Sequence, residues 1–176
     1  MCPNTCLAFT GPFKNDDKCS ECGEVCFDFV TKKGRQQFYT IPIGPMLQAL
    51  WADIEGAHKL DYRQRKTQEI LDKIVRTSRV TRYEDLIHGS MYIKAIISGH
   101  IEDTDMVLML SMDGAQLYTH KASDCWIYIW VIFDYSPELR YKQRQILPGG
   151  FIPGPNKPNI IDSFLFPGLH HLSSLQ

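Results

Sequence analysis

Apolar residues recur at helical spacing in two stretches of the first half of the chain. The first stretch follows Pro45, a residue that favours the first turn of a helix, and Gly56 is expected to interrupt it. The second runs from about Leu60 to Ile74 and has charged residues on its other face. The pattern predicts two consecutive helices, with apolar positions at Met46, Leu47, Leu50, Trp51, Ile54, Tyr62, Ile70, Leu71 and Ile74.

From Met91 onward the chain contains continuous apolar runs rich in β-branched and aromatic residues. The segments "YIKAII", "MVLMLSM" and "CWIYIWVIF" predict strands covered on both faces. "YSPELR" predicts a turn, with a further strand around Arg144 to Leu147. "LPGGFIPGPNKPN" has too many glycines and prolines for a helix or a central strand, so it is expected to be a loop. "IIDSFLFPGLHHLSSL" could begin a helix.

These elements predict a mixed α/β (α+β) protein with three consecutive regions. Residues 1–40 hold most of the cysteines, residues 41–88 form a helical, basic linker, and residues 89–176 begin a sheet. The 176 residues are about one domain's worth of chain. The alternative is a small module followed by an incomplete larger domain.

Composition indicates a globular protein and narrows its setting. Hydrophobic residues make up 44% and charged residues 22%, which is enough to bury a core. The net charge of −1 gives no overall sign of nucleic-acid binding, so any basic surface must be local. We find neither a secretory signal nor an apolar run long enough to cross a membrane. These features predict a nuclear or cytosolic protein that is not secreted. In those compartments clustered cysteines more often hold metal than form disulfides.

Five of the six cysteines fall in the first 26 residues. Cys2 and Cys6 are separated by three residues, and Cys19 and Cys22 by two, with a glycine after the second pair. Two such pairs suit a tetrahedral zinc ion, and Cys26 is a spare or substitute ligand. The alternative is a set of unrelated reduced thiols. We predict a structural Zn²⁺ site whose binding energy helps to fold the segment.

A local excess of positive charge follows the predicted first helix. From Lys59 to Arg82 the chain has eight basic residues against three acidic ones. This excess is the best candidate for a face that contacts DNA phosphates. A solvated helix with pairs such as Glu69 and Lys73 is at least as good an interpretation. The candidate nucleic-acid-binding residues are Lys59, Arg63, Arg65 and Lys66.

Asp113 and Gly114 directly follow the apolar run "MVLMLSM" in the sequence. A carboxylate at the end of a buried strand must be neutralised by a cation, by hydrogen bonds or by a metal. Magnesium takes one or two carboxylates together with phosphate oxygens, and pairs of such ions cleave phosphodiesters. An ordinary Asp-Gly turn is the alternative. Asp103, Asp105 and Asp124 are expected in solvated turns.

A set of longer segments extends these observations along the whole chain. In order they are "CxxxCxxxTGPF…CSECGE", "PIGPMLQALW", "YRQRKTQEIL", "MVLMLSMDGAQLY", "SDCWIYIWVIFDYSPELRY" and "LPGGFIPGPNKPNIIDSFLFPGLHHL". The sequence resembles the cut-and-paste transposases of the CACTA (En/Spm-like) class, and in particular the Plavaka group of fungal elements. The ordered set is far more specific than the cysteine spacing or the Asp-Gly step alone.

The resemblance implies a zinc-ribbon-like knuckle ahead of an RNase H-like mixed sheet. Asp113 matches the first of three acidic ligands to Mg²⁺ or Mn²⁺, and Cys2, Cys6, Cys19 and Cys22 match the zinc ligands. The implied reaction is hydrolysis of a phosphodiester at a transposon end, followed by attack of the freed 3′-hydroxyl on target DNA. The implied partner is DNA, and the full-length form is expected to be able to form homo-oligomers.

The second and third acidic ligands cannot be assigned to any residue. We therefore expect a truncated, N-terminal part of a transposase that is catalytically inactive alone, since one carboxylate cannot assemble a two-ion site. Two other interpretations remain open. One is a zinc-dependent DNA-binding or protein-interaction module without catalysis, and the other is a poorly folded relic with exposed apolar strands. His170 and His171 are expected to have a local structural role.

Overall fold

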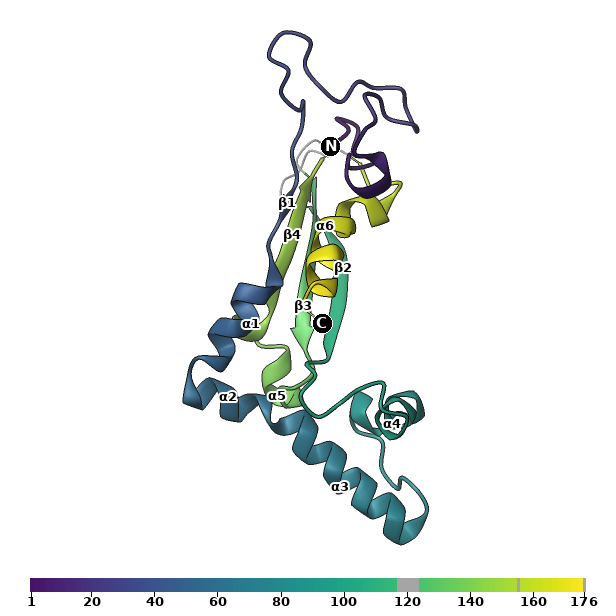
Figure 1. Ribbon diagram of the computed structural model, residues 1–176, viewed down its shortest axis with the longest axis vertical. Helices are drawn as coiled ribbons and strands as arrows, with labels where there is room; N and C mark the ends of the chain where they lie inside the picture. Colours follow the sequence, from purple (N-terminus) through teal and green to yellow (C-terminus); the bar gives the residue numbers. More distant parts are fainter. Residues whose placement is uncertain (117–123, 155, 176) are drawn as a thin grey trace. The chain divides into compact units, whose positions relative to one another are not determined.

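The computed structural model describes residues 1–116, 124–154 and 156–175 of the chain (Figure 1). It is a mixed α/β structure with an N-terminal four-cysteine cluster, a series of helices and a four-stranded antiparallel sheet. Its strands are β1 (Tyr39–Thr40), β2 (Leu108–Gln116), β3 (Asp124–Ile132) and β4 (Leu147–Pro153). Its α-helices are α1 (Ile43–Trp51), α2 (Ile54–Leu60), α3 (Tyr62–Thr77), α4 (Ser90–Ile97), α5 (Pro137–Arg140) and α6 (Ile161–Ser173).

The sheet has the order β1-β4-β3-β2. Strands β2 and β3 confirm the predictions made from "MVLMLSM" and "CWIYIWVIF". Strand β4 lies between β1 and β3, so the prediction of a loop at "LPGGFIPGPNKPN" is wrong for its first seven residues. The pairing of β3 with β4 shifts register between Tyr128 and Ile129, where Pro148 pairs with Ile129 and Gly149 is passed over. A proline is tolerated there because the regular ladder is already interrupted.

The glycines of β4 are required by the ring that covers them. A Cβ atom on Gly150 would lie 2.4 Å from the Tyr128 ring and 2.4 Å from the Tyr39 carbonyl oxygen, and one on Gly149 would lie 2.3 Å from the same ring. Tyr128 is 1% exposed. Packing against Tyr128 therefore explains why β4 contains Gly149 and Gly150, although two adjacent glycines by local propensity favour a loop.

Helices α1 and α3 confirm the two predicted helices, but the break between α1 and α2 lies before Gly56. The Asp53 carboxylate accepts a hydrogen bond of 2.7 Å from the Gly56 backbone N–H and caps α2. Gly56 is thus the third residue of α2, and the expectation that it interrupts the helix is wrong. A side chain there would lie 2.8 Å from the Leu50 carbonyl oxygen, which explains the glycine.

The segment "YIKAII" forms helix α4, so its prediction as a strand is wrong. Tyr92 is buried against Ile70 and Ile87, and Ile93 and Ile96 pack against the same cluster. Residues at positions 92, 93 and 96 share one face of a helix, and in a short apolar run this spacing is hard to distinguish from a strand. "YSPELR" contains the short helix α5, and the strand predicted near Arg144 is the 3-10 turn η4 (Gln143–Gln145) before β4.

The chain forms two compact units made of non-consecutive segments. The first, the cysteine unit, comprises Met1–Leu47, Leu110–Trp130 and Leu147–Gln176. The second, the helical unit, comprises Gln48–Met109 and Val131–Ile146. Within the cysteine unit α6 packs on the sheet, as predicted for a helix at "IIDSFLFPGLHHLSSL", and buries Phe164 with Ile152. The described helices include none long and apolar enough to span a bilayer.

Candidate metal centre

Four cysteine sulfurs converge at the N-terminal end of the cysteine unit. The Sγ atoms of Cys2, Cys6, Cys19 and Cys22 all lie within 4.8 Å of one another, and those of Cys2 and Cys22 are 3.5 Å apart. A tetrahedral Zn²⁺ with four thiolate ligands at about 2.3 Å requires sulfurs about 3.8 Å apart. The predicted zinc ligands therefore come together, and their spacing fits a structural Zn²⁺ ion.

Two tight turns place the sulfurs. In the first, the Thr5 N–H donates to the Cys2 carbonyl at 2.9 Å, and Thr5 adopts a left-handed φ of 61°. In the second, the Gly23 N–H donates to the Cys19 carbonyl at 2.8 Å, and Gly23 has a φ of 74°. Glycine adopts this conformation without the steric cost of a Cβ. The glycine after the second cysteine pair therefore allows the tight turn that places Cys19 and Cys22.

Burial and mutual proximity keep most of these thiols protonated unless a cation binds. Cys2, Cys6 and Cys19 are buried, whereas Cys22 is exposed. Burial raises the pKa of Cys2 and of Cys6, and the neighbouring thiols raise the pKa of Cys6 further. The backbone hydrogen bond from Glu24 lowers the pKa of Cys22 to about 7, with help from the Asn4 amide 3.6 Å away. A divalent cation would stabilise all four thiolates at once.

The cysteine cluster is anchored to the N-terminal end of α6. The Cys6 carbonyl accepts hydrogen bonds from the N–H groups of Asn159, at 3.0 Å, and Ile160, at 2.9 Å. The Ala8 N–H donates to the Ser163 hydroxyl at 2.8 Å. Four protein ligands leave no open position for a substrate, so the chemistry that this centre can supply is structural.

Cys26 lies outside this group. It is 3% exposed, its N–H donates to the Asp17 carbonyl at 2.8 Å, and its carbonyl accepts from the Arg35 N–H at 3.1 Å. Burial raises the pKa of its thiol. Among the described residues the metal-capable group is complete without Cys26, which belongs instead to the backbone ladder of the following hairpin.

Asp113 is an exposed residue inside β2. The strand continues to Gln116, so the carboxylate does not mark the end of the strand as the sequence suggested. Its Oδ1 atom accepts a hydrogen bond of 2.8 Å from the Gly114 N–H. Gly114 packs beneath Trp126, whose ring would lie 3.1 Å from a Cβ at that position. In the described part of the chain Asp113 joins no group of three or more potential metal ligands.

The four residues predicted to contact phosphates differ in burial and in ion pairing. Arg63 is 1% exposed, and its Nε atom donates to the Asp134 carboxylate at 2.8 Å. Its other nitrogens donate to Tyr92 and to the backbone carbonyls of residues 102, 103 and 105. Lys59 pairs with Glu55 at 2.6 Å, and Lys66 pairs with Glu69 at 2.5 Å. Within the described residues Arg65 is exposed and makes no ion pair.

Asp134 is the strand-end carboxylate that sequence reasoning missed. It follows β3 by two residues, is 4% exposed and is neutralised by the Arg63 guanidinium. Its second oxygen accepts from the Val107 N–H at 2.9 Å. The argument applied to Asp113, that a buried carboxylate requires a cation, in fact applies here. The available signal was the position of Asp134 directly after the longest apolar run, "CWIYIWVIF".

Comparison of the chain with protein-family models, with curated proteins and with solved structures found no match. The function must therefore be inferred from the chain's own residues. Three features bear on it: the four-cysteine centre, the exposed carboxylate of Asp113, and the exposed cations of the helical unit.

Proposed function

We propose that this chain is a zinc-stabilised, N-terminal part of a cut-and-paste DNA transposase of the CACTA class. In this proposal β2 is the first strand of an RNase H-like fold, and Asp113 is the first of its three acidic metal ligands. The observation that carries the proposal is the position of Asp113 on β2, the first of three successive strands, β2, β3 and β4, that lie side by side in the antiparallel sheet and are followed in the chain by α6. An exposed carboxylate on a rigid strand is free to bind Mg²⁺ or Mn²⁺ and a DNA phosphate together.

The chemistry assigned to Asp113 is electrostatic. Water attacks the phosphorus of a phosphodiester at the transposon end, the bond to the 3′-oxygen breaks, and the freed 3′-hydroxyl later attacks target DNA. Divalent ions held by Asp113 and by further carboxylates would stabilise charge on the attacking and leaving oxygens, and a pair of ions needs several carboxylates. Asp113 supplies one of them, so this chain binds one ion weakly and does not cleave DNA alone.

The zinc centre has a supporting role in this proposal. It anchors the first eight residues to α6, and α6 packs on the sheet that carries Asp113. The position of a metal ligand must be held to within about 0.5 Å for catalysis, and rigid elements with a supporting shell achieve this best. Zinc therefore acts on the reaction through the rigidity of the cysteine unit.

Manganese binding at Asp113 tests the proposal directly. Mn²⁺ added to the zinc-loaded chain should broaden the amide signals of Met112 to Ala115 first in an NMR spectrum. Asp113→Asn should remove this broadening, whereas Asp162→Asn, at an exposed acid of α6 in the same unit, should preserve it. Equal broadening in the Asp113→Asn chain would exclude a metal site at this residue.

A cleavage assay gives an independent check. The chain alone, with Mg²⁺ or Mn²⁺, should leave a supercoiled plasmid intact, because the remaining acidic ligands are not supplied. Metal-dependent nicking that persists after Asp113→Asn would show that another site is responsible. Such a result would refute the assignment of Asp113 without affecting the zinc centre.

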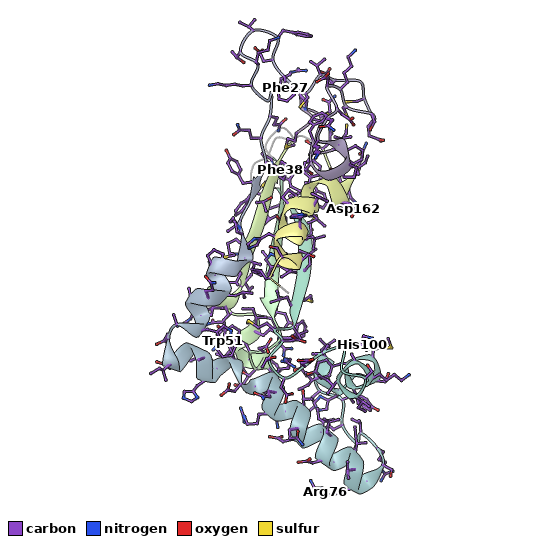
Figure 2. The ribbon with its side chains drawn as sticks, viewed as in Figure 1. Phe27, Phe38, Trp51, Arg76, His100 and Asp162 are labelled. Atoms are coloured by element: carbon purple, nitrogen blue, oxygen red, sulfur yellow. The ribbon has the colours of Figure 1, made fainter. Side chains whose placement is uncertain are left out.

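Exposed cations in and after α3 support a second candidate, a zinc-dependent DNA-binding module without catalysis. In α3 and the two residues that follow it, four exposed basic side chains make no ion pair: Arg65, Lys73, Arg76 and Arg79. Arg76 lies in the last, C-terminal turn of α3 (Figure 2). Of the predicted set only Arg65 is retained, since Arg63 is buried and Lys59 and Lys66 are paired.

Salt dependence tests this second candidate. Duplex DNA binding should weaken with salt, with a logarithmic slope of about −0.9 for each phosphate contacted. Arg65→Glu combined with Arg76→Glu should reduce the slope by about 2. The matched control is Lys59→Glu with Glu55→Lys, which exchanges the charges of an existing pair. An unchanged slope in the arginine variant would exclude this face as a DNA contact.

A further inference from the structure

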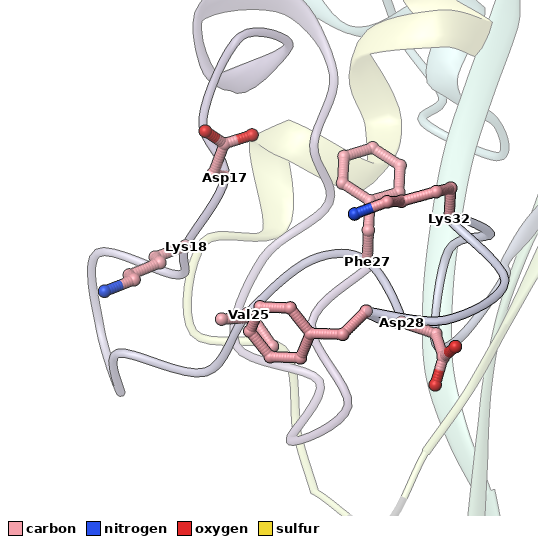
Figure 3. Close-up of a pocket in the computed structure, with 7 residues that line it drawn as sticks. Asp17, Lys18, Val25, Phe27, Asp28 and Lys32 are labelled. Carbon is pink, nitrogen blue, oxygen red and sulfur yellow. The ribbon is translucent and has the colours of Figure 1, made fainter.

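A pocket of about 550 Å³ opens in the hairpin that follows the second cysteine pair (Figure 3). Its apolar lining is Val25, Phe27 and Phe29, and its charged lining includes Lys18 and Lys32. In the view of Figure 3 the two lysines lie on opposite sides of Val25. The volume falls in the range of pockets that bind small organic ligands. None of these residues takes part in the zinc centre or in the site proposed at Asp113.

The hairpin holds its aromatic residues in a fixed frame. Isolated bridges pair Lys18 with Val25 and Phe27 with Gly34. At the tip the Asp28 carboxylate accepts hydrogen bonds from Val30 N–H at 3.0 Å, from Thr31 N–H at 2.7 Å and from the Thr31 hydroxyl at 3.0 Å. These bonds pre-organise the loop, which reduces the entropy lost when a ligand binds.

Two aromatic rings remain open to solvent in this ordered loop. Phe27 is 47% exposed and Phe29 is 76% exposed. Exposed aromatic rings grouped around a concave surface mark a binding site more often than an accident of composition. The rings offer flat apolar faces, and the lysines offer positive charge beside them. A ligand that matches both is planar, aromatic and anionic.

We propose that this pocket binds one base of a single-stranded nucleic acid, with the base stacked on Phe27 and Phe29 and the flanking phosphates at Lys18 and Lys32. The inference rests on the proposed DNA function for the identity of the ligand. Stacking on aromatic side chains with nearby cations is the usual way in which proteins hold unpaired bases. A transposase must handle the single strands that strand transfer creates, and Asp113 is not among the residues that line this pocket.

Two acidic residues also line the pocket and shape its preference. The Asp28 carboxylate is occupied by the hydrogen bonds of the loop tip. Asp17 lines the pocket as well, and a carboxylate there can accept a hydrogen bond from an exocyclic amine. Cytosine, adenine and guanine carry such an amine and thymine does not. The pocket should therefore disfavour thymine.

A lipid surface is the main competing partner for an exposed apolar loop, and Val30 distinguishes the two. Val30 is 90% exposed at the tip of the hairpin but does not line the pocket. Insertion into a membrane would bury the most protruding apolar side chain, Val30, first. Base stacking requires the rings of Phe27 and Phe29 and should not depend on Val30.

The experiment measures binding of fluorescein-labelled single-stranded 12-mers to the zinc-loaded chain by fluorescence anisotropy. Phe29→Leu, which removes the ring but keeps an apolar side chain, should weaken binding about tenfold. Phe29→Tyr keeps the ring and should restore affinity, and Val30→Ala should leave it unchanged. Lys32→Glu should also weaken binding and reduce its salt dependence. The visible spectrum of the cobalt-substituted protein shows that each variant retains the four-cysteine centre.

Three outcomes would overturn the inference. The first is single-strand binding that does not respond to Phe29→Leu. The second is equal weakening by Phe29→Leu and Val30→Ala. The third is binding to vesicles of 30% phosphatidylserine in phosphatidylcholine that depends on Val30, without single-strand binding. Loss of manganese binding at Asp113 is read from different variants and signals, so failure of the proposed transposase function and failure of this pocket are separable.

Discussion

The two units of the molecule each bury a cluster of ionisable groups, but only one of them contains its own cation. In the helical unit the Asp134 carboxylate is neutralised by the Arg63 guanidinium, with a separation of 2.8 Å. In the cysteine unit four sulfurs converge within 4.8 Å, and three of the cysteines are buried. The second cluster could take up a Zn²⁺ ion from outside. The helical unit carries both charges of its buried pair, whereas the proposed zinc site adds stability to the cysteine unit only when metal is supplied.

Removal of zinc should have the largest effect and should separate the two units. Chelation, or Cys19→Ser, should remove on the order of 10 kcal/mol of binding energy from the cysteine unit. Hydrogen exchange should then lose protection at Cys6, Ala8 and Ser163 but keep it in the cluster of Ile70, Ile87 and Tyr92. Cys26→Ser is the control and should retain one equivalent of zinc. Simultaneous loss of protection in both units would contradict the prediction that only the cysteine unit depends on zinc.

Breaking the buried ion pair should destabilise the protein by about 3–5 kcal/mol, because Arg63→Met leaves an uncompensated carboxylate. Combining Arg63→Met with Asp134→Leu should regain only part of this, since Arg63 also donates to the carbonyls of residues 103 and 105. Urea unfolding followed by helical circular dichroism measures both effects. The destabilisation should be the same with and without a chelator. A chelator-dependent loss would mean that the two clusters are coupled.

Close packing in the sheet should contribute to the stability of the cysteine unit in addition to any bound metal. Gly150→Ala places a methyl group against the Tyr128 ring and the Tyr39 carbonyl, and overpacking of this kind typically costs about 1–3 kcal/mol. Gly34→Ala is the control, because its Cβ would meet its nearest neighbour at an ordinary 3.9 Å. Thermal unfolding of the zinc-loaded chain measures the difference. Equal melting temperatures for the two variants would show that β4 can adjust.

The smallest effect concerns pH and the exposed cysteine. In the metal-free chain Cys22 has a pKa lowered to about 7, so its thiolate is present above that pH and is lost as the pH falls through it. Iodoacetamide should therefore modify Cys22 before the buried cysteines, with a rate that reaches half its maximum near pH 7. Zinc should block the reaction. Mass spectrometry of tryptic peptides identifies the modified residue, and earlier modification of Cys6 would contradict the burial described here.

Sequence predicted the parts of this molecule that depend on neighbours along the chain. The convergence of Cys2, Cys6, Cys19 and Cys22 was predicted from their spacing, because each turn that places a sulfur spans only a few residues. Strand β3 was found because its apolar run is long and rich in β-branched and aromatic residues. Helix α3 was found because its apolar positions, which include Ile70 and Ile74, repeat at helical spacing, although the face that is buried also contains the polar residues Arg63 and Thr67. In all three cases the physical cause is local.

The elements that were predicted incorrectly depend on distant residues. Strand β4 contains two adjacent glycines because Tyr128, about 20 residues earlier, covers them, and propensity rules do not include that ring. Arg63 looked like a phosphate ligand because its partner Asp134 is 71 residues away. Asp113 looked like the end of a strand because the sequence "DG" favours a turn, whereas the Trp126 ring packs on Gly114 and the strand continues.

The anchoring of Cys6 to Asn159 and Ile160 has a consequence for how the protein is made. A ribosome releases the cysteine pairs first and the segment that anchors them more than 130 residues later. At about 5–20 residues per second, this interval lasts on the order of 10 s. During that interval the nascent thiols are accessible to metal carriers and to oxidants alike. The order of translation thus gives zinc capture a limited time window before the tertiary structure closes around the sulfurs.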